Sequence, residues 1–329
     1  MIKAYCISDN NVDVYRQLGM VYPGGNGLNT AVNFVRTGNQ AAYCGYVGND
    51  RLGDLQKEAL KAEGVDTSCI RTVDMQQDWA WIMLLNGDRR FCGSNLSIRK
   101  SHHITLEDVK RGQTGEYDLI CTGLETTFEP DAWAQLGKSD VPVVCDFANN
   151  WDSLWGPGRN GLEESKGIVD YFCLSMENRP EKPEDLLKKC VEEYGAKLAL
   201  GTLGARGSVV YNGKKYFYQT AFELEPIDTM ACGDTYISTF ASAYLGGLKL
   251  LNECAGIIGI GRENRYYAET EDALISHSMC LASLNAARNC LSRGGFGHGI
   301  PYDDSMISRS TNLEAQYERL NKFKRENNL

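Results

Sequence analysis

The sequence predicts an α/β fold: a doubly wound, mostly parallel sheet with helices on both faces and a small β lid. Short apolar segments recur along the chain and are typical of strands that are covered on both faces. Amphipathic helical patterns separate several of these segments, and such alternation favours parallel strands. Two further stretches break the alternation and predict hairpins. The expected strands lie within residues 4–8, 41–48, 117–124, 141–148, 169–175 and 196–204.

The helical patterns have recognisable ends. Residues 28–38 carry apolar side chains at helical spacing and finish at Gly38, a residue suited to a helix C-terminus. Residues 51–64 and 183–195 follow the same pattern and also end at glycines. Pro183 stands at a plausible first helical position, where the missing N–H group costs nothing. We therefore expect three well-bounded helices between the strands.

The two hairpins are expected to differ in position. Residues 79–94 would turn at Asn86-Gly87 and project from the core sheet as part of a lid, together with a segment near 10–22. Residues 207–219 would turn at Asn212-Gly213 and form an edge hairpin. We expect one domain over residues 1–301, with lid segments at about 10–22 and 76–95, followed by a charged helical tail over residues 302–329.

Composition limits the classes of partner. The chain has 329 residues, of which 43% are hydrophobic and 23% charged, so it is long enough to bury a sizeable core. Its formal net charge of -9 argues against binding to nucleic acid or to an anionic membrane. Twelve scattered cysteines and a start without a signal-peptide pattern favour a cytoplasmic protein in a reducing compartment.

The segment "DTMACGDTYISTF", residues 228–240, places small residues before a predicted helix. From Asp234 onward apolar residues repeat at helical spacing, so Ala231, Cys232 and Gly233 would lie at the helix N-terminus. Free N–H groups and the helix dipole make such a position an anion site. Asp234 could simply stabilise the helix; a catalytic role requires an anion that is transferred beside it.

A glycine-rich turn, "YPGGNGLNTAVNF", covers residues 22–34. Its glycines do not have the GxGxxG spacing of a dinucleotide site, and a plain tight turn is the alternative. Carboxylates and amides near it could hydrogen-bond the hydroxyls of a sugar. These candidates are Asp9, Asp13, Asn26 and Asn29.

A third glycine-containing turn, "GTLGARGSVVYNG", begins at the end of a predicted buried strand. Thr202, Gly204 and Gly207 would let the phosphates of a nucleotide lie close to the backbone. By itself this stretch also fits an ordinary turn between a strand and a hairpin.

Taken in order, these segments resemble the PfkB (ribokinase-like) carbohydrate kinases over about residues 4–300. The resemblance rests on "PGGNGLNTA", "GYVGNDRLG", "TLGARG" and "DTMACGD". It implies ATP and Mg²⁺ as cofactors, with a monovalent cation as a further candidate, and Asp234 as the catalytic base that deprotonates the acceptor hydroxyl. The remaining implied roles are an anion hole at Ala231, Cys232 and Gly233, sugar binding by Asp13, Gly24, Gly25 and Asn29, and nucleotide binding by Thr202, Gly204 and Gly207.

Within that family the chain is most similar to fructoselysine 6-kinases. The N-terminal "SDNNVDVYRQLGMVYPGGNGLNTAV" and "CDFANNWDSLW" at 145–155 carry this likeness. It implies phosphorylation of the C6 hydroxyl of a glycated amino acid, with Arg89 and Arg90 of the lid near the sugar or the carboxylate. The alternatives are a kinase for a plain sugar, such as fructose, ribose or a keto-deoxy sugar acid, and a catalytically silent sugar-binding regulator.

Two features depart from the family pattern. The Asn-x-x-Glu motif that organises magnesium is expected about five residues after Asp170, at Ser175 and Asn178, whereas a literal match lies at Asn178 and Glu181. Cys232 replaces a small Ala or Gly, and its thiol would make the site sensitive to oxidation.

The apolar "WAWIML" of the lid also suggests a homodimer that buries this stretch between subunits.

Overall fold

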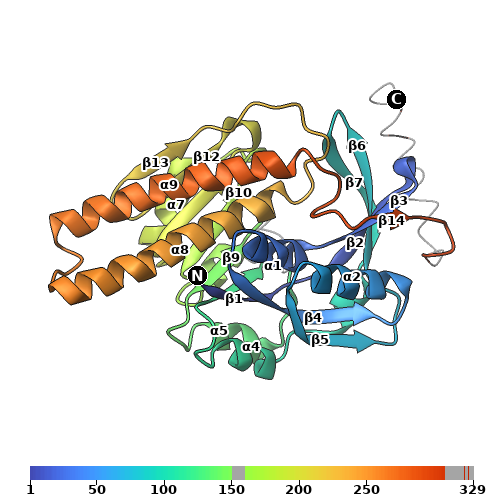
Figure 1. The fold of residues 1–329 in the computed structure, drawn as a ribbon, viewed down its shortest axis with the longest axis horizontal. Coiled ribbons are helices and arrows are strands. Elements are labelled where there is room, and N and C mark those ends of the chain that lie inside the picture. Colours follow the sequence, from blue (N-terminus) through green and yellow to red (C-terminus); the bar gives the residue numbers. More distant parts are fainter. Residues whose placement is uncertain (150–159, 308–321, 323–324, 326–329) are drawn as a thin grey trace.

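The computed structural model describes residues 1–149, 160–307, 322 and 325. Their strands form two sheets that are flanked by helices (Figure 1). The main sheet has the order β13 (Tyr216–Gln219), β12 (Ser208–Tyr211), β11 (Leu198–Thr202), β10 (Tyr171–Ser175), β9 (Val143–Asp146), β8 (Leu119–Gly123), β1 (Lys3–Ile7), β4 (Gln40–Gly48) and β5 (Asp66–Val73). The helices are α1 (Asn26–Arg36), α2 (Arg51–Ala62), α3 (Ser97–Ser101), α4 (Leu106–Gly112), α5 (Pro130–Leu136), α6 (Gly161–Glu164), α7 (Pro183–Glu192), α8 (Cys232–Ile258) and α9 (Arg265–Asn289).

The main sheet confirms the predicted class. Strands β5, β4, β1, β8, β9, β10 and β11 are parallel to their neighbours, and the hairpin β12–β13 adds two antiparallel strands at one edge. Each of the six strand segments expected from the sequence contains a strand of this sheet. Strand β5 was not expected, because its outward-facing residues are polar and it lies at the opposite edge.

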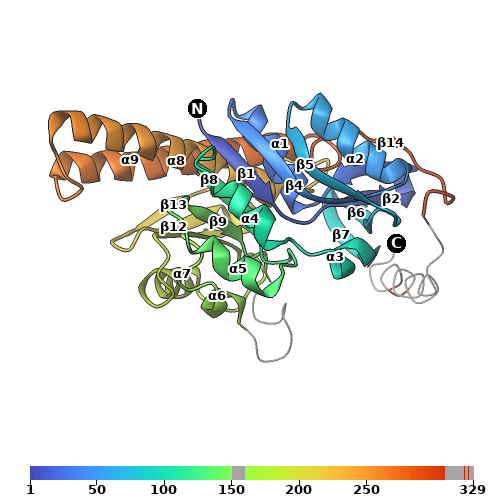
Figure 2. The same cartoon turned by 90° about the horizontal axis from the view of Figure 1, so that it is seen from below.

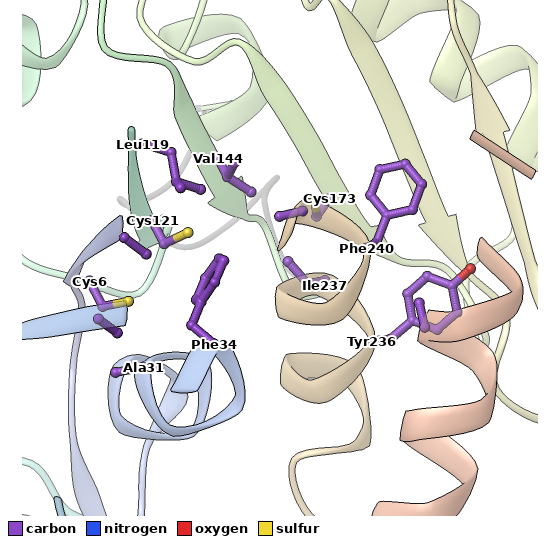
Figure 3. Close-up of a cluster of buried hydrophobic side chains, with 14 of the residues drawn as sticks. Cys6, Ala31, Phe34, Leu119, Cys121, Val144, Cys173, Tyr236, Ile237 and Phe240 are labelled. Atoms are coloured by element: carbon purple, nitrogen blue, oxygen red, sulfur yellow. The ribbon is translucent and has the colours of Figure 1, made fainter. Parts of the chain in front are cut away.

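Two layers of helices cover the sheet, as Figure 2 shows. Side chains alternate along each strand, so Ala4 and Cys6 of β1 join one apolar cluster and Tyr5 and Ile7 join another. Helices α1, α8 and α9 pack on the first cluster, which includes Phe34 (Figure 3). Helices α4, α5 and α7 pack on the second. Burial on both faces explains why these strands read as continuous apolar runs.

A second, five-stranded sheet contains the predicted lid hairpin. Its order is β14 (Ile300–Pro301), β3 (Met20–Gly24), β2 (Asn11–Tyr15), β6 (Trp79–Leu85) and β7 (Asp88–Asn95). The turn between β6 and β7 uses Asn86 and Gly87 at φ values of 52° and 78°, as a two-residue hairpin turn of this hand requires. In Figure 1 this sheet stands beside the main sheet. Its action as a lid stays a prediction.

The apolar stretch of β6 is buried within its own chain. Trp79, Trp81 and Met83 pack with Leu52 and Leu55 of α2, and Trp79 is only 1% exposed. The stretch "WAWIML" is therefore covered within its own chain, by α2 on one face and on the other by the cluster in which Ala80 and Ile82 pack with Tyr15, so its burial does not require a second subunit. The homodimer itself remains an untested prediction.

Segment 45–53 joins the two sheets. The Asp50 carboxylate caps α2 by accepting hydrogen bonds from Leu52 N (3.1 Å) and Gly53 N (2.9 Å). Its second oxygen accepts from Gln77 N at 3.0 Å, directly before β6. The motif "GYVGNDRLG" thus fixes the second sheet to the main body.

The C-terminal third is mostly a long helical hairpin. Helices α8 and α9 lie side by side and extend beyond the strands (Figure 1). This explains the length of the charged segment 250–279, which lies in the outer part of the hairpin. Of the predicted tail, residues 302–307 reach the second sheet, where Ile307 is buried, and the rest lies outside the described residues apart from positions 322 and 325. None of the described helices has the length and apolar character needed to cross a membrane.

Candidate active site

The N-terminus of α8 forms the centre of the site. The helix begins at Cys232 with Ala231 as its N-cap, and Asp234 lies in the first turn, as expected. The first N–H groups of a helix have no acceptor within it, and the Cys232 N–H makes only a long contact, 3.4 Å, with the Thr229 carbonyl oxygen. Ala231 adopts a left-handed conformation, with φ 57°, which costs an alanine about 1–2 kcal/mol.

Asp228 anchors the segment that leads into this helix. Its carboxylate accepts hydrogen bonds from Met230 N (2.9 Å), Gly294 N (2.9 Å) and the Tyr15 hydroxyl (2.8 Å). Strand β2, the segment after α9 and the start of α8 are therefore tied to one buried carboxylate. This network fixes where the helix N-terminus points.

Two asparagines of α1 hold the Asp234 carboxylate. Asn29 Nδ2 donates to Asp234 Oδ2 at 2.7 Å, and Asn26 Nδ2 donates to Asp234 Oδ1 at 3.0 Å. Asn26 Nδ2 also lies 2.7 Å from Asp146 Oδ2, at the end of β9. The structure thus brings together the glycine-rich turn and the "DTMACGD" segment, which are more than 200 residues apart in sequence.

The surroundings of the Asp234 carboxyl raise its pKa to a value near 7. Burial is the main reason that its pKa rises to about 7, and the nearby Asp146 carboxylate raises it further. The hydrogen bond from Asn29 and the charge of Arg89 oppose that rise. Burial likewise raises the pKa of Asp146 to about 6. Asp234 can therefore take up and release a proton near pH 7.

Buried polar atoms next to this carboxylate lack partners. Asp13, on β2, is 1% exposed; Asn11 donates to its Oδ1 at 2.9 Å, while its Oδ2 has no partner among the described residues. Burial, followed by repulsion from Asp228, raises the pKa of Asp13 to about 8. Asn29 Oδ1 is also buried without a partner in the described part of the chain. Such atoms normally find a hydrogen bond, so they are candidate contacts for a polar ligand.

Glycines keep these side chains close together. A side chain at Gly24 would collide with the Asp13 carboxyl group, and one at Gly295 would collide with the Asn29 amide. Gly25, the N-cap of α1, has φ 98° and lies against the backbone of Asn10. Gly24 and Gly25 therefore allow close approach of backbone and side chains at this turn, and their binding of a sugar stays a prediction.

A cavity of about 580 Å³ opens beside Asp9, between the end of β1 and strand β7. Arg99 of α3 crosses one wall, with its Nη1 atom 2.8 Å from the Glu125 carboxylate and 3.5 Å from that of Asp9. Burial raises the pKa of Asp9. The cavity is lined by Asp9, Asn11, Ala80, Arg90, Phe91, Cys92, Gly93, Ser94, Leu96, Arg99 and Glu125.

The two predicted lid arginines occupy different places. Arg90 lines the cavity and forms an ion pair with Asp88 at 2.9 Å. Arg89 instead donates to the Thr229 carbonyl oxygen (3.0 Å) and hydroxyl (3.3 Å), in the segment that precedes α8. Arg89 therefore holds the hairpin against the helix N-terminus, and contact of either residue with a substrate stays a prediction.

The predicted nucleotide loop follows β11. Thr202 ends this strand, and Gly204 and Gly207 have positive φ values of 59° and 98° in the turn to β12. Gly204 is exposed whereas Thr202 and Gly207 are half-buried, and the Glu177 carboxylate lies directly against Gly204. Strands β1, β8, β9, β10 and β11 are parallel, so this loop lies at the same edge of the sheet as Asp9 and Asp146.

The sequence suggests Asn178 and Glu181 as metal ligands, and the neighbouring Glu177 lies against Gly204 of this loop. Glu181 forms an ion pair with Arg179 at 2.6 Å, and Asn178 is exposed. Within residues 1–149 and 160–307 there is no group of three or more His, Cys, Asp or Glu residues that could hold a metal ion. A metal role for Asn178 and Glu181 stays a prediction, and Glu177 is a further candidate.

Sequence reasoning missed several residues of the site. Asp146 stands inside the predicted strand segment 141–148, so its position after the strand's apolar core was a usable signal. Asp228 belongs to a quoted motif but had no assigned role. Arg99 and Glu125 carried no local signal, because only the fold brings them to Asp9.

A comparison of the chain with known protein families identifies the family to which it belongs. The model of the pfkB family of carbohydrate kinases matches residues 1–255, well over half of the chain. The chain belongs to this family. The resemblance expected from its four motifs is confirmed, and it is a carbohydrate kinase.

Individual relatives agree with the family assignment. Fructosamine kinase FrlD of Bacillus subtilis (strain 168) is 29% identical over 316 residues, which cover 95% of this chain and 100% of that protein. Fructoselysine 6-kinase of Escherichia coli (strain K12) is 30% identical over 247 residues, covering 74% of this chain and 90% of that protein. Among solved structures, fructokinase from Vibrio cholerae O395, with fructose, ADP and a calcium ion bound, superposes with a TM-score of 0.65 at 18% identity, covering 93% and 98% of the two chains. The last similarity confirms the ribokinase-like fold.

Proposed function

We propose that this carbohydrate kinase transfers the γ-phosphoryl group of ATP to the C6 hydroxyl of fructoselysine or a related fructosamine. The observation that carries the proposal is the Asp234 carboxyl, with a pKa of about 7, in the first turn of α8, where the Cys232 N–H makes only a long 3.4 Å contact with the Thr229 carbonyl oxygen among the described residues. A base and an anion site are what phosphoryl transfer to a hydroxyl needs. The presence of this base also argues against a catalytically silent sugar-binding regulator.

In this reaction Asp234 accepts the proton of the acceptor hydroxyl while the hydroxyl oxygen bonds to the γ-phosphorus atom. The bond from that phosphorus to the β–γ bridging oxygen breaks, and ADP leaves with the electron pair. Backbone N–H groups of Ala231, Cys232 and Gly233 would stabilise the negative charge on the transferred group. Asn26 and Asn29 would orient the base through their hydrogen bonds to its two oxygens.

Recognition of the sugar would use the unpaired buried atoms. Asp13 Oδ2 and Asn29 Oδ1 have no partners among the described residues. Asn29 Oδ1 accepts a hydrogen bond, whereas the Asp13 carboxyl, with a pKa of about 8, accepts when ionised and donates when protonated, and a sugar hydroxyl matches each of these groups. Asp9, whose side chain is 8% exposed, lies at the mouth of the neighbouring cavity. Gly24 and Gly25 would let the sugar approach the backbone of the turn before α1.

The cavity beside Asp9 favours a glycated amino acid over a plain sugar. Its volume of about 580 Å³ falls in the range of small-molecule sites and leaves room beyond a monosaccharide. Its lining includes Arg90, which pairs with Asp88, and Glu125, which pairs with Arg99. It also includes the aromatic ring of Phe91, which is 65% exposed. A zwitterionic amino acid on an alkyl stem carries the complementary carboxylate, ammonium and apolar groups.

The nucleotide would lie across the loop of Thr202, Gly204 and Gly207, which is exposed at residues 204–206 and lies at the same edge of the sheet. The scarcity of clustered metal ligands in the described chain fits Mg²⁺, which is usually held by one or two carboxylates together with phosphates and water. Glu177, with Asn178 and Glu181 as the alternative, would supply the protein ligand. When bound, the Mg²⁺ ion neutralises phosphate charge. We also include a monovalent cation among the proposed cofactors.

Two further features belong to this proposal. We expect the enzyme in the cytoplasm, because all twelve cysteines are free thiols and ATP is the phosphoryl donor. We also propose a homodimer that forms through the second sheet, where Phe91 of β7 is exposed.

An ADP-release assay over fructoselysine, fructose, ribose and adenosine tests the function. We expect fructoselysine to give the highest kcat/KM and Glu125→Gln to raise its KM without changing that for fructose. Higher turnover of fructose would contradict only the substrate assignment. Absence of ADP release with every acceptor would contradict the kinase reaction.

A further inference from the structure

Two thiols meet at the proposed anion hole. Cys232 Sγ, on the first residue of α8, lies 2.8 Å from Cys290 Sγ at the C-cap of α9. Both residues are free cysteines. The separation is below the ~3.5 Å at which non-bonded heavy atoms ordinarily pack. It approaches the length of a disulfide bond, about 2.05 Å.

The backbone holds this pair in place. The Cys290 carbonyl oxygen accepts hydrogen bonds from Ile227 N (2.8 Å) and Asp228 N (3.2 Å), and Asn289 Nδ2 donates to the Met230 carbonyl oxygen at 2.8 Å. The end of α9 is therefore fixed to the segment that leads into α8. From their separation of 2.8 Å, the two sulfur atoms must approach by ~0.75 Å to reach the length of a disulfide bond.

The pair also has the accessibility and polarity that oxidation requires. Cys232 and Cys290 are half-buried, whereas seven other cysteines of the chain are fully buried. A hydrogen bond from the Cys232 thiol lowers the pKa of Cys290, and the charge of Arg89 lowers it further. The same hydrogen bond, followed by burial, raises the pKa of Cys232. Cys290 is therefore the thiolate that reacts first, with Cys232 as its resolving partner.

We propose that Cys232 and Cys290 form a reversible disulfide that switches off phosphoryl transfer when a peroxide is present. The Cys290 thiolate attacks one oxygen of hydrogen peroxide, the O–O bond breaks, and a sulfenic acid and water result once the leaving hydroxide is protonated. Cys232, deprotonated, then attacks the sulfenic sulfur and releases the second water. Two thiols and one peroxide become one disulfide and two waters, and a dithiol reductant reverses the change.

The position of Cys232 explains why the bond would inhibit the kinase. Its backbone N–H belongs to the proposed anion hole, and Asp234 follows two residues later. A disulfide imposes its own torsion angles on the Cys232 side chain and so constrains the first turn of α8. That turn begins at Ala231, whose left-handed conformation leaves it little freedom to adjust.

The test uses the full chain treated with hydrogen peroxide and then with an alkylating reagent. Mass spectrometry of proteolytic fragments should find the peptides of Cys232 and Cys290 linked, and dithiothreitol should separate them. Kinase activity should fall at least tenfold with linkage and return on reduction. Because linkage is read by mass, it is measured even if the proposed substrate is wrong.

Variants separate this disulfide from general oxidative damage. Cys290→Ser should keep the activity of the reduced enzyme and resist peroxide, with Cys290→Ala as a second variant if the serine form does not fold. Cys254→Ser removes an exposed thiol far along α8 and should remain as sensitive as the native chain. Separately alkylated peptides, linkage without loss of activity, or peroxide sensitivity that persists in both Cys290 variants would each overturn the proposal.

Discussion

The acceptor half and the nucleotide half of the proposed site are built in different ways. The acceptor half consists of side chains from four distant segments, and Asp13 and Asn29 within it are almost completely buried. The nucleotide half is a turn between β11 and β12 that is exposed at residues 204–206 and whose shape depends on Gly204 and Gly207. The acceptor half offers side-chain groups, whereas the nucleotide half offers a tight turn that is held by its own backbone hydrogen bonds, from Leu203 N to the Gly207 carbonyl oxygen and from Gly207 N to that of Gly204.

This difference has a consequence for specificity. Buried, unpaired side-chain atoms reject ligands that leave them unpaired, because each such atom costs ~1–3 kcal/mol. An exposed turn discriminates weakly, since phosphates are common to all nucleotides. The acceptor should therefore be selected strictly and the nucleotide loosely, and side-chain substitutions should affect the two halves unequally.

The largest expected effect is in the acceptor half. Asp234→Asn removes the base but keeps a side chain of the same size, so kcat should fall by about 10²–10⁴. Calorimetric titration should show unchanged ADP affinity, because no nucleotide-loop residue bonds Asp234 among the described hydrogen bonds. Loss of ADP binding would mean that the two halves are not separable.

A smaller loss is expected for Asn29→Ala. It removes the 2.7 Å hydrogen bond to Asp234 and an acceptor for the sugar, and hydrogen bonds to charged groups are worth ~1.5–3 kcal/mol. Steady-state kinetics should show kcat/KM for the sugar reduced about 10- to 100-fold, with KM for ATP unaltered. Asn285→Ala, which breaks a contact with Thr239 instead, is the matched control and should leave both constants unchanged. An equal effect on ATP would contradict the division of the site.

In the nucleotide half the backbone should matter more than the side chains. Gly207 has φ 98°, and a side chain there would meet the backbone of Gln219, so Gly207→Ala should raise KM for ATP and cost ~1–3 kcal/mol of stability. Arg206→Ala changes an exposed side chain and should alter KM for ATP by only about twofold. A larger effect of Arg206→Ala than of Gly207→Ala would show that this loop recognises nucleotide through side chains.

The smallest effect is expected at Ala231. Ala231 is held in a left-handed conformation that glycine adopts without strain, so Ala231→Gly should relieve about 1 kcal/mol of strain. Glycine also loses more conformational entropy on folding, and this loss reduces the net gain in stability. Denaturant unfolding measures this change, and kcat should stay within about twofold of the native value because the N–H groups are retained. A clear loss of stability would indicate that the alanine methyl group packs against a neighbour that matters more than the strain.

Several parts of this architecture could be predicted from local sequence. Continuous apolar runs marked the buried parallel strands, and glycines marked the ends of α1, α2 and α7. Small residues before Asp234 located the start of α8. These features depend on residues near one another in sequence, where backbone geometry and burial leave a periodic pattern.

Other parts depend on contacts that no local pattern reveals. The polar residues of β5 conceal an edge strand, and the sequence pattern predicts Asp13 as a ligand residue but does not predict strand β2, in which it lies. Cys232 and Cys290 are 58 residues apart, and neither has a neighbour that indicates the other. The pairing of Arg99 with Asp9 and Glu125 likewise exists only after α3 packs beside the sheet.

The central claim, that Asp234 is a base whose pKa is set by the acceptor half, is tested most directly by the pH dependence of kcat/KM. In the native enzyme activity should fall as the pH drops through about 7, because protonation of Asp234 removes the base. Asp146→Asn removes a negative charge that disfavours the ionised form, so the Asp234 pKa should fall and the acidic limb should move to lower pH. A limb that stays in place, or one that moves to higher pH, would contradict the account.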